Sequence, residues 1–269
     1  MLSRTADHLY WMSRYTERAE NTARMLDVNV QTAMLPQPAA VSESGWRGLL
    51  SISELQNAYQ ALYGEISAAK VLEFMVSDAD NPSSIVSCLR GARENARAVR
   101  GTLTTEVWET HNQTWLELQQ RLVAKDHERD PTRFFEWVKY RSHLSRGVTV
   151  GTMLMDESLH FMRLGTFLER ADNTARLLDV KFHAIENDFM GVAAPREQEY
   201  DFYHWSAILR SVFVLLGLAA LAVLDDELVF AIRHAGDGEG TVLAADSVEA
   251  VLEDAHVGEH PRMHVALEA

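Results

Sequence analysis

The sequence has few of the features that mark secreted or membrane-spanning proteins. Its 269 residues include one cysteine, Cys88, which cannot form an internal disulfide and so fits a reducing cytoplasm. The N-terminus lacks the apolar segment of a secretory signal, so we expect no such signal. The longest apolar run, residues 212–224, has thirteen residues, whereas a membrane-spanning helix needs about 20. We therefore expect a cytoplasmic chain that is not anchored in a membrane.

The sequence also lacks an excess of basic residues. The net charge is −14. Residues 225–269 contain eleven acidic residues and two arginines, a net of −9, so residues 1–224, with 28 acidic and 23 basic residues, carry only −5. Sequence-independent nucleic-acid binding needs a basic face that meets the phosphate backbone. We therefore expect no nucleic-acid partner.

The sequence does show helical periodicity over most of its length. In residues 3–35 apolar side chains recur three, four or seven positions apart, and the proline- and glycine-containing stretch 36–45 ends the pattern. Asn81 is expected to cap a helix with Pro82 at its first position. Strand-like alternation is missing before residue 225, so the predicted fold class is all-α, a helical bundle. The other predicted helices cover 46–63, 81–101, about 108–122, 132–146 and 148–188, the last bent at Gly151 or Gly165.

A polar stretch occurs twice in the chain. Residues 17–28 (ERAENTARMLDV) and 169–180 (ERADNTARLLDV) agree at ten of twelve positions. Trp46 and Trp205 follow the two copies, each with apolar residues three and four positions later. The period of about 150 residues is too long for a solenoid array. We predict a domain over 1–212 built from two duplicated units, about 1–123 and 132–212, related by a pseudo-twofold axis. The repeat fails after Val212, and 213–269 is expected to be a divergent, acidic, partly disordered tail.

The repeated stretches carry polar faces that admit two interpretations. On a helix, residues three and four apart share a face, so one face is shared by Arg14, Glu17, Asn21 and Arg24, and in the second copy by Glu169, Asn173 and Arg176. Arg18, Glu20 and Asp27, and Arg170 as the mate of Arg18, are predicted to point to another surface. In the structural interpretation the two helices cross and form an interhelical network that fixes register. In the functional interpretation the faces line a groove for a charged ligand or peptide, gripped by arginine.

Other candidate sites are weaker. Glu157 and His160 have the Glu-x-x-His spacing of di-iron bundles, but the position matching Glu157 in the first copy is Thr5, so half of that motif is missing. We therefore expect neither a metal nor another cofactor. Cys88 is expected in the core. A row of arginines is predicted to be a solvated face or a docking surface for an acidic partner: Arg90, Arg93, Arg97 and Arg100.

Three segments carry a family resemblance: LSRTADHLYWMSRYTERAENTARMLDV, DNPSSIVSCLRGARENARAVRGTLTTEVWE and GTMLMDESLHFMRLGTFLERADNTARLLDVK. Over about residues 1–212 the chain resembles the bacterial alpha-E family, an uncharacterised all-helical domain named for a Glu-Arg motif. The resemblance places that motif at Glu17–Arg18 and Glu169–Arg170. It implies a cytoplasmic protein, encoded beside or fused to a circularly permuted ATP-grasp protein, in a system that forms peptide or amide bonds. The chain departs from the family after Val212.

These observations leave three hypotheses of function. In the leading one, the chain is a non-catalytic helical partner of an ATP-grasp ligase and presents its Glu/Arg faces to enzyme or peptide. In the second, it is an enzyme that uses Glu17 and Glu169 as acid/base groups in a groove between the repeats. A metal-carboxylate bundle is the third. Glutamates in an open pocket without arginine would favour the enzyme, and glutamates closed into buried ion pairs would disfavour it.

Overall fold

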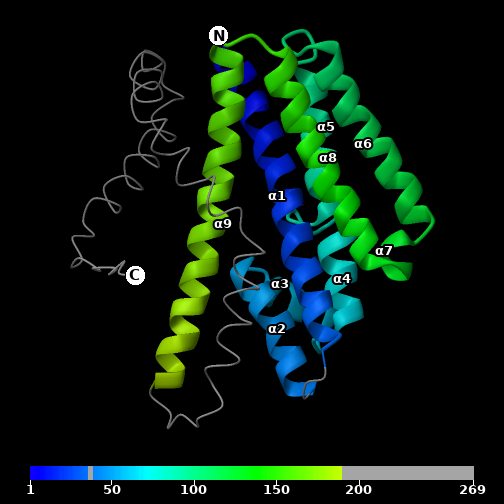
Figure 1. The fold of residues 1–269 in the computed structure, drawn as a ribbon, viewed down its shortest axis with the longest axis vertical. Coiled ribbons are helices and arrows are strands. Elements are labelled where there is room, and N and C mark those ends of the chain that lie inside the picture. Colours follow the sequence, from blue (N-terminus) through cyan, green and yellow to red (C-terminus); the bar gives the residue numbers. More distant parts are fainter. Residues whose placement is uncertain (36–38, 190–269) are drawn as a thin grey trace, which may run out of the picture. The chain divides into compact units, whose positions relative to one another are not determined.

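The computed structural model describes residues 1–35 and 39–189, and this part of the chain is helical without a strand (Figure 1). The all-α prediction is thereby confirmed for these residues. None of the described helices is both long and apolar enough to cross a bilayer. The helices are α1 (Ser3–Ala33), α2 (Ala39–Ile52), α3 (Gln56–Tyr63), α4 (Ala68–Val76), α5 (Ile85–Ala98), α6 (Thr105–Val123), α7 (Asp126–Arg129), α8 (Pro131–Thr152) and α9 (Glu157–Phe189).

Helix α1 is the central element, because α5, α8 and α9 all pack along it (Figure 1). Helices α1 and α9 start at the same end of the bundle, where the amino group of Met1 donates to Glu157 Oε2 at 2.8 Å. From there they run side by side in the same direction (Figure 1). Helix α6 packs on α5 and α8, and α2 packs on both α1 and α9. The two copies of the repeated stretch therefore begin on neighbouring, parallel helices.

The interior contains two apolar clusters separated along α1. The smaller cluster includes Leu9 and Met12 of α1 together with Met162 of α9. The larger one takes up α1 from Ala19 onward, and its largest fully buried side chains are Tyr59, Phe74, Phe134 and Phe135. The polar segment Ser13–Arg18 of α1 lies between these clusters. The charged side chains of this segment form ion pairs with side chains of opposite charge, and this offsets the cost of burying them.

Helices α1 and α9 approach so closely that only glycine fits at one position. A Cβ atom on Gly165 would overlap the carbonyl oxygen of Tyr10 and lie 3.1 Å from its carbonyl carbon. It would also lie 3.3 Å from the Cβ atom of Ser13. Ser13 is the residue that matches Gly165 in the first copy of the repeat, 152 residues earlier. Two small residues at equivalent positions thus allow the two backbones to touch.

The predicted helix over 148–188 is wrong at its start. Helix α8 continues to Thr152, four residues separate it from α9, and α9 begins at Glu157. The Asp156 carboxylate accepts hydrogen bonds from the backbone amides of Ser158 and Leu159 and caps α9. Gly151 lies within α8 and Gly165 within α9, so neither marks the break. The apolar periodicity continues across the break, so it does not reveal the start of α9, which is determined by the Asp156 cap.

Two other predicted helix boundaries also differ from the structure. Helix α5 begins at Ile85 after the cap Ser84, not at Pro82. Asn81 Oδ1 does accept from the Ser83 backbone amide, as a cap would, but this bond closes a separate turn before the helix, and the Asn81 side-chain nitrogen donates to the carbonyl of Phe74. The predicted helix over 46–63 is two helices, α2 and α3, with Glu54 between them in the left-handed region at φ 56°. The core assignment of Cys88 is confirmed, since the residue has no exposed surface.

Burial makes Cys88 unreactive in the native state. Burial raises the pKa of its thiol to about 12, and the neighbouring Arg18 offsets only part of that effect. The thiolate is the species that reacts with alkylating reagents. We therefore expect iodoacetamide to leave Cys88 unlabelled in native protein and to label it fully in denaturant, measured as mass against time. Labelling of native protein at the denatured rate would contradict the burial.

The interface between α6 and α8 is polar, and it contains a buried histidine. His111 of α6 is 6 % exposed, and its Nε2 lies 3.2 Å from Ser145 Oγ of α8. Arg141 donates from Nε to Thr114 Oγ1 at 2.8 Å within the same interface. Burial lowers the pKa of His111 to about 4, with a further contribution from the Arg141 charge. The imidazole is therefore neutral in the folded protein at neutral pH.

The buried histidine predicts a loss of stability in mild acid. The unfolded chain takes up the His111 proton near pH 6.5 and the native state only near pH 4, so this contribution is complete above pH 6.5 and is lost on acidification between those values. The free energy of unfolding should fall by about 2 kcal/mol from pH 7 to pH 5 on this account. Urea titrations at both pH values would measure it. His111→Gln should remove most of this dependence, and an unchanged dependence would contradict the assignment.

Candidate functional site

Each Glu-Arg motif forms ion pairs with the other one. Arg170 of α9 donates from Nε and Nη2 to the two carboxylate oxygens of Glu17, at 2.8 and 3.0 Å. Arg18 of α1 donates from Nε and Nη2 to the two oxygens of Glu169, at 2.5 and 2.9 Å. Both contacts are bidentate, the geometry in which arginine and carboxylate bind most strongly. The glutamate of each copy thus receives the arginine of the other.

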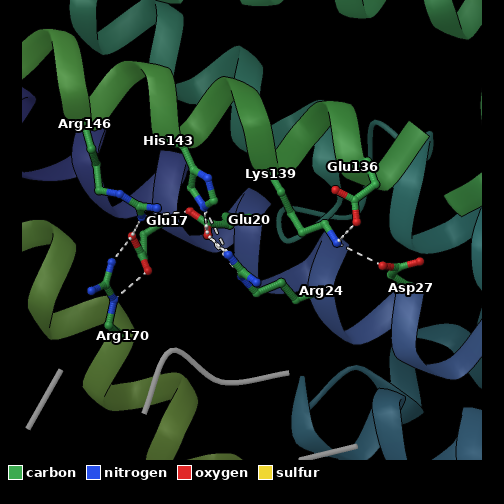
Figure 2. A network of polar contacts seen from close by, with 9 residues as sticks. All are labelled: Glu17, Glu20, Arg24, Asp27, Glu136, Lys139, His143, Arg146 and Arg170. Atoms are coloured by element: carbon green, nitrogen blue, oxygen red, sulfur yellow. Dashed lines mark hydrogen bonds and ion pairs between the residues drawn. The ribbon is translucent and has the colours of Figure 1, made fainter. Parts of the chain in front are cut away.

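A second arginine reaches each of these carboxylates. Arg14 donates from Nε to Glu169 Oε2 at 2.6 Å. Arg146 of α8 donates from Nη1 to Glu17 Oε2 at 2.8 Å (Figure 2). Glu17 is 2 % and Glu169 is 4 % exposed, so solvent has almost no access to either carboxylate. Both motif glutamates are therefore buried and neutralised by two guanidinium groups each.

The network continues along α1 toward α8. Arg146 Nη1 lies 2.8 Å from Glu20 Oε2, and Arg24 Nη2 lies 2.6 Å from Glu20 Oε1 (Figure 2). His143 Nε2 lies 3.1 Å from the same Oε1 atom. Burial alone would raise the pKa of Glu20, but Arg146, Ser142 and Arg24 together lower it to about 2. Glu20 is therefore a carboxylate over the whole physiological pH range.

A third carboxylate of α1 is paired with α8 in the same way. Lys139 Nζ donates to Asp27 Oδ2 at 2.9 Å and to Glu136 Oε1 at 2.6 Å (Figure 2). Asp27 is 4 % exposed. The acidic residues of α1 at 17, 20 and 27 thus meet basic residues of α8 at 146, 143 and 139, in an antiparallel order.

Aromatic rings pack against Arg14 and Arg18, the two arginines of α1 that contact α9. The Arg14 guanidinium lies 5.3 Å from the centre of the Trp11 ring, and that of Arg18 lies 5.9 Å from the Tyr15 ring. Burial by itself would lower the pKa of Arg18, but the hydrogen bonds and charge of Glu169 raise it above its ordinary value. Cation–π contacts and a bidentate carboxylate together fix these long side chains in one orientation.

The structure corrects the predicted division of the repeated helix into two faces. Arg18 was expected on a different surface from Glu17, but both contact α9. Glu20 and Asp27 were expected on that outer surface too, but they are buried against α8. The prediction failed because α1 has α5, α8 and α9 around it, so its polar side chains meet other helices rather than solvent.

The remaining candidate residues lie at the margins of this network. Asn21 is buried, and within the described part of the chain its amide nitrogen has no hydrogen-bond partner. Asn173 is partly exposed on α9. Arg176 contacts Asp172 at 3.0 Å and Glu54 at 2.6 Å, and so connects α9 to the turn after α2.

The Glu-x-x-His pair is not part of the network. The Glu157 side chain is 70 % exposed and pairs with the amino group of Met1. His160 is partly exposed one turn further along α9. Among residues 1–35 and 39–189, no group of three histidine, cysteine or acidic side chains is placed to hold a metal ion.

Sequence reasoning missed the contribution of α8. Arg146 and His143 were not among the candidate residues. A signal was present: Lys139, His143 and Arg146 follow at four and three residues, so they share one helical face. That basic face matches the buried acidic residues of α1.

Comparison with known proteins agrees with this architecture. A family model described as a predicted alpha-helical domain with a conserved ER motif, Alpha-E, matches residues 1–215. Uncharacterised proteins of Mycobacterium bovis and Mycobacterium tuberculosis (strain CDC 1551 / Oshkosh) are each 30% identical to the chain over 140 residues. That alignment covers 48% of this chain and 15% of each relative, so the chain spans only a small part of their length. No solved structure matches. With the family model covering most of its length and both Glu-Arg motifs in place, the chain belongs to the Alpha-E family.

Proposed function

We propose that this chain is a non-catalytic helical module that binds an ATP-grasp ligase in a cytoplasmic system forming peptide or amide bonds. One observation carries the non-catalytic part: both motif glutamates are buried, and each is neutralised by two arginines. In this proposal the Glu-Arg motifs hold α1 and α9 together, and the outer surface of the bundle meets the partner.

The same observation weighs against a general acid or base in a groove between the repeats. Such a group must come within hydrogen-bonding reach of the proton it transfers, and its pKa should lie near the working pH. Glu17 and Glu169 direct both oxygens to guanidinium groups, and the neighbouring Glu20 has a pKa of about 2. A substrate would have to displace a bidentate arginine to reach either motif carboxylate.

The duplication is part of the proposal. We infer two helical units related by a pseudo-twofold axis between α1 and α9. The reciprocal contacts Glu17–Arg170 and Arg18–Glu169 support this axis, since a twofold rotation exchanges one pair with the other. The contact between the matching residues Ser13 and Gly165 supports it too.

The ATP-grasp partner is proposed from the family association that the sequence resemblance implies. The mycobacterial relatives support the view that this domain is a module of larger proteins, because the aligned region makes up only 15% of each of those chains. A domain that occurs as a small part of a longer polypeptide often works beside the other domains of that polypeptide.

Co-expression with an ATP-grasp protein encoded beside this chain tests the proposal. We expect the two proteins to elute as one complex in size-exclusion chromatography and the ATPase rate to change on mixing. The Glu17→Gln variant and the exposed control Glu43→Gln should both change the ATPase rate as much as the wild-type chain does. The proteins are compared at equal concentrations of folded protein, determined by circular dichroism. No complex and no change of rate would overturn the partnership. A complex in which folded Glu17→Gln loses the activity while Glu43→Gln keeps it would overturn the non-catalytic role.

A further inference from the structure

Helix α5 and the turn after it present a line of arginines to solvent. We call Arg90, Arg93, Arg97 and Arg100 the arginine row. Residues 85–104 contain these four arginines and one acidic residue, a net charge of +3, in a chain whose net charge is −14. Spacings of three, four and three residues place the row along one side of the helix, over about 15 Å. The Arg97 side chain is 65 % exposed, and Arg90 and Arg100 are also exposed.

Weak contacts orient these side chains but leave most of their charge unmatched. Arg93 donates from Nε to Asn112 Oδ1 at 3.0 Å, and the Arg100 guanidinium lies 5.2 Å from the centre of the Trp108 ring. Arg93 and Arg97 both pair with Glu94. Within the described part of the chain, Glu94 is the one carboxylate that forms ion pairs with the row. Ordered arginines lose less side-chain entropy when a ligand binds.

Helix α6 places Trp108 and Leu116 on the same side of the hairpin as the arginine row. The contacts Arg100–Trp108 and Arg93–Asn112 show that α5 and α6 are antiparallel neighbours in a fixed register. Leu116 lies two helical turns after Trp108 on α6, so the same antiparallel register places it near Arg90, and it is 48 % exposed. The surface of this helical hairpin therefore combines four guanidinium groups with an indole ring and an exposed leucine.

We propose that this surface binds an acidic amphipathic helix of a partner protein. Carboxylates spaced three, four and three residues apart on that helix would pair with the arginine row, and its apolar residues would pack on Trp108 and Leu116. Arginine binds carboxylate in bidentate fashion, and complementary charge speeds association and fixes register. Exposed Leu116 on the neighbouring α6 favours a protein helix over a nucleic-acid backbone as the occupant, because a phosphate backbone has no apolar side chains to pack on it. The proposal does not depend on the partner being an ATP-grasp ligase.

A designed peptide probes the surface directly. The probe is a fluorescein-labelled helical peptide of about 18 residues, with glutamates at the complementary spacing and leucines on the adjoining face. A matched peptide carries glutamine in place of glutamate. The protein is the full chain as wild type, as Arg90→Gln/Arg97→Gln, and as the control Arg129→Gln/Arg133→Gln, whose arginines are exposed on α7 and α8. Fluorescence anisotropy measures affinity, and circular dichroism confirms that all variants are folded.

The expected result is an affinity for the acidic peptide that falls about tenfold or more in Arg90→Gln/Arg97→Gln and stays unchanged in the control. Raising the salt from about 50 to about 200 mM should weaken binding by wild type. Equal binding by the two double variants, or equal binding of the glutamine peptide, would reduce the row to a solvated face and overturn the proposal. Tighter binding of a single-stranded oligonucleotide through the same arginines would overturn it in favour of a nucleic-acid site.

Discussion

Gly165→Ala should lower the free energy of unfolding by about 2 kcal/mol or more, although alanine is the better helix former. The reason is steric. The added methyl group would overlap the backbone carbonyl of Tyr10 and press on Ser13, and neither can rotate away as the end of a flexible side chain could. Helices α1 and α9 would have to move apart, and this would stretch the ion pairs between Glu17 and Arg170 and between Arg18 and Glu169. Urea denaturation followed by circular dichroism measures the change.

Gly147 supplies the matched control. It also lies inside a helix, α8, but a Cβ atom there would meet nothing within 4 Å. Gly147→Ala should therefore raise the free energy of unfolding by about 0.5–1 kcal/mol through helix propensity and reduced backbone entropy. A Gly165→Ala protein as stable as the Gly147→Ala protein would show that the helices are not in the close contact described.

Glu169→Ala should cost about 3–5 kcal/mol, because it removes the common partner of two arginines. The Arg14 and Arg18 side chains are 15 % and 25 % exposed, so water only partly replaces the lost carboxylate. The control is Glu43→Ala, which breaks an ion pair with Arg47 in which both side chains are about half exposed. That substitution should change stability by no more than about 0.5 kcal/mol, as is typical of surface pairs.

A double-mutant cycle tests whether the cost arises in the proposed pair. Arg18→Ala and Glu169→Ala share one interaction, so their effects should not add, and the coupling energy should exceed about 1 kcal/mol. The same cycle between Arg18→Ala and Glu43→Ala should give additive effects, because these residues have no common partner. Additive effects for Arg18 and Glu169 would mean that the bidentate contact contributes little.

Much of the fold could be predicted from the sequence, because the signals were local. The 3.6-residue periodicity over residues 3–35 predicted α1 to within two residues of its end at Ala33. The break between α8 and α9 was missed, since the cap at Asp156 interrupts an apolar pattern that otherwise continues. Caps are set by single side chains and are easily masked by a strong periodic pattern.

The candidate site was harder to predict, because its partners are far apart in the sequence. The repeat pointed to Glu17 and Glu169, and an interhelical network was one of the two interpretations. Nothing local indicated that the pairs would form between copies, with Glu17 on Arg170 rather than on a neighbour in α1. The helical-wheel division that put Arg18 on a separate surface assumes that a helix has one solvent side. A helix surrounded on three sides breaks that assumption.

The reciprocal ion pairs also constrain the order in which the chain can fold. Synthesis of α1 is complete long before that of α9, and 153 residues separate Glu17 from Arg170. Until α9 has been made, Arg14 and Arg18 have no Glu169, and the side of α1 that carries them must stay hydrated. Contacts between residues so distant along the chain form late, because the loop between them must close first. On the ribosome, the central helix of this bundle therefore emerges before α9 and is fully buried only after α9 has been made.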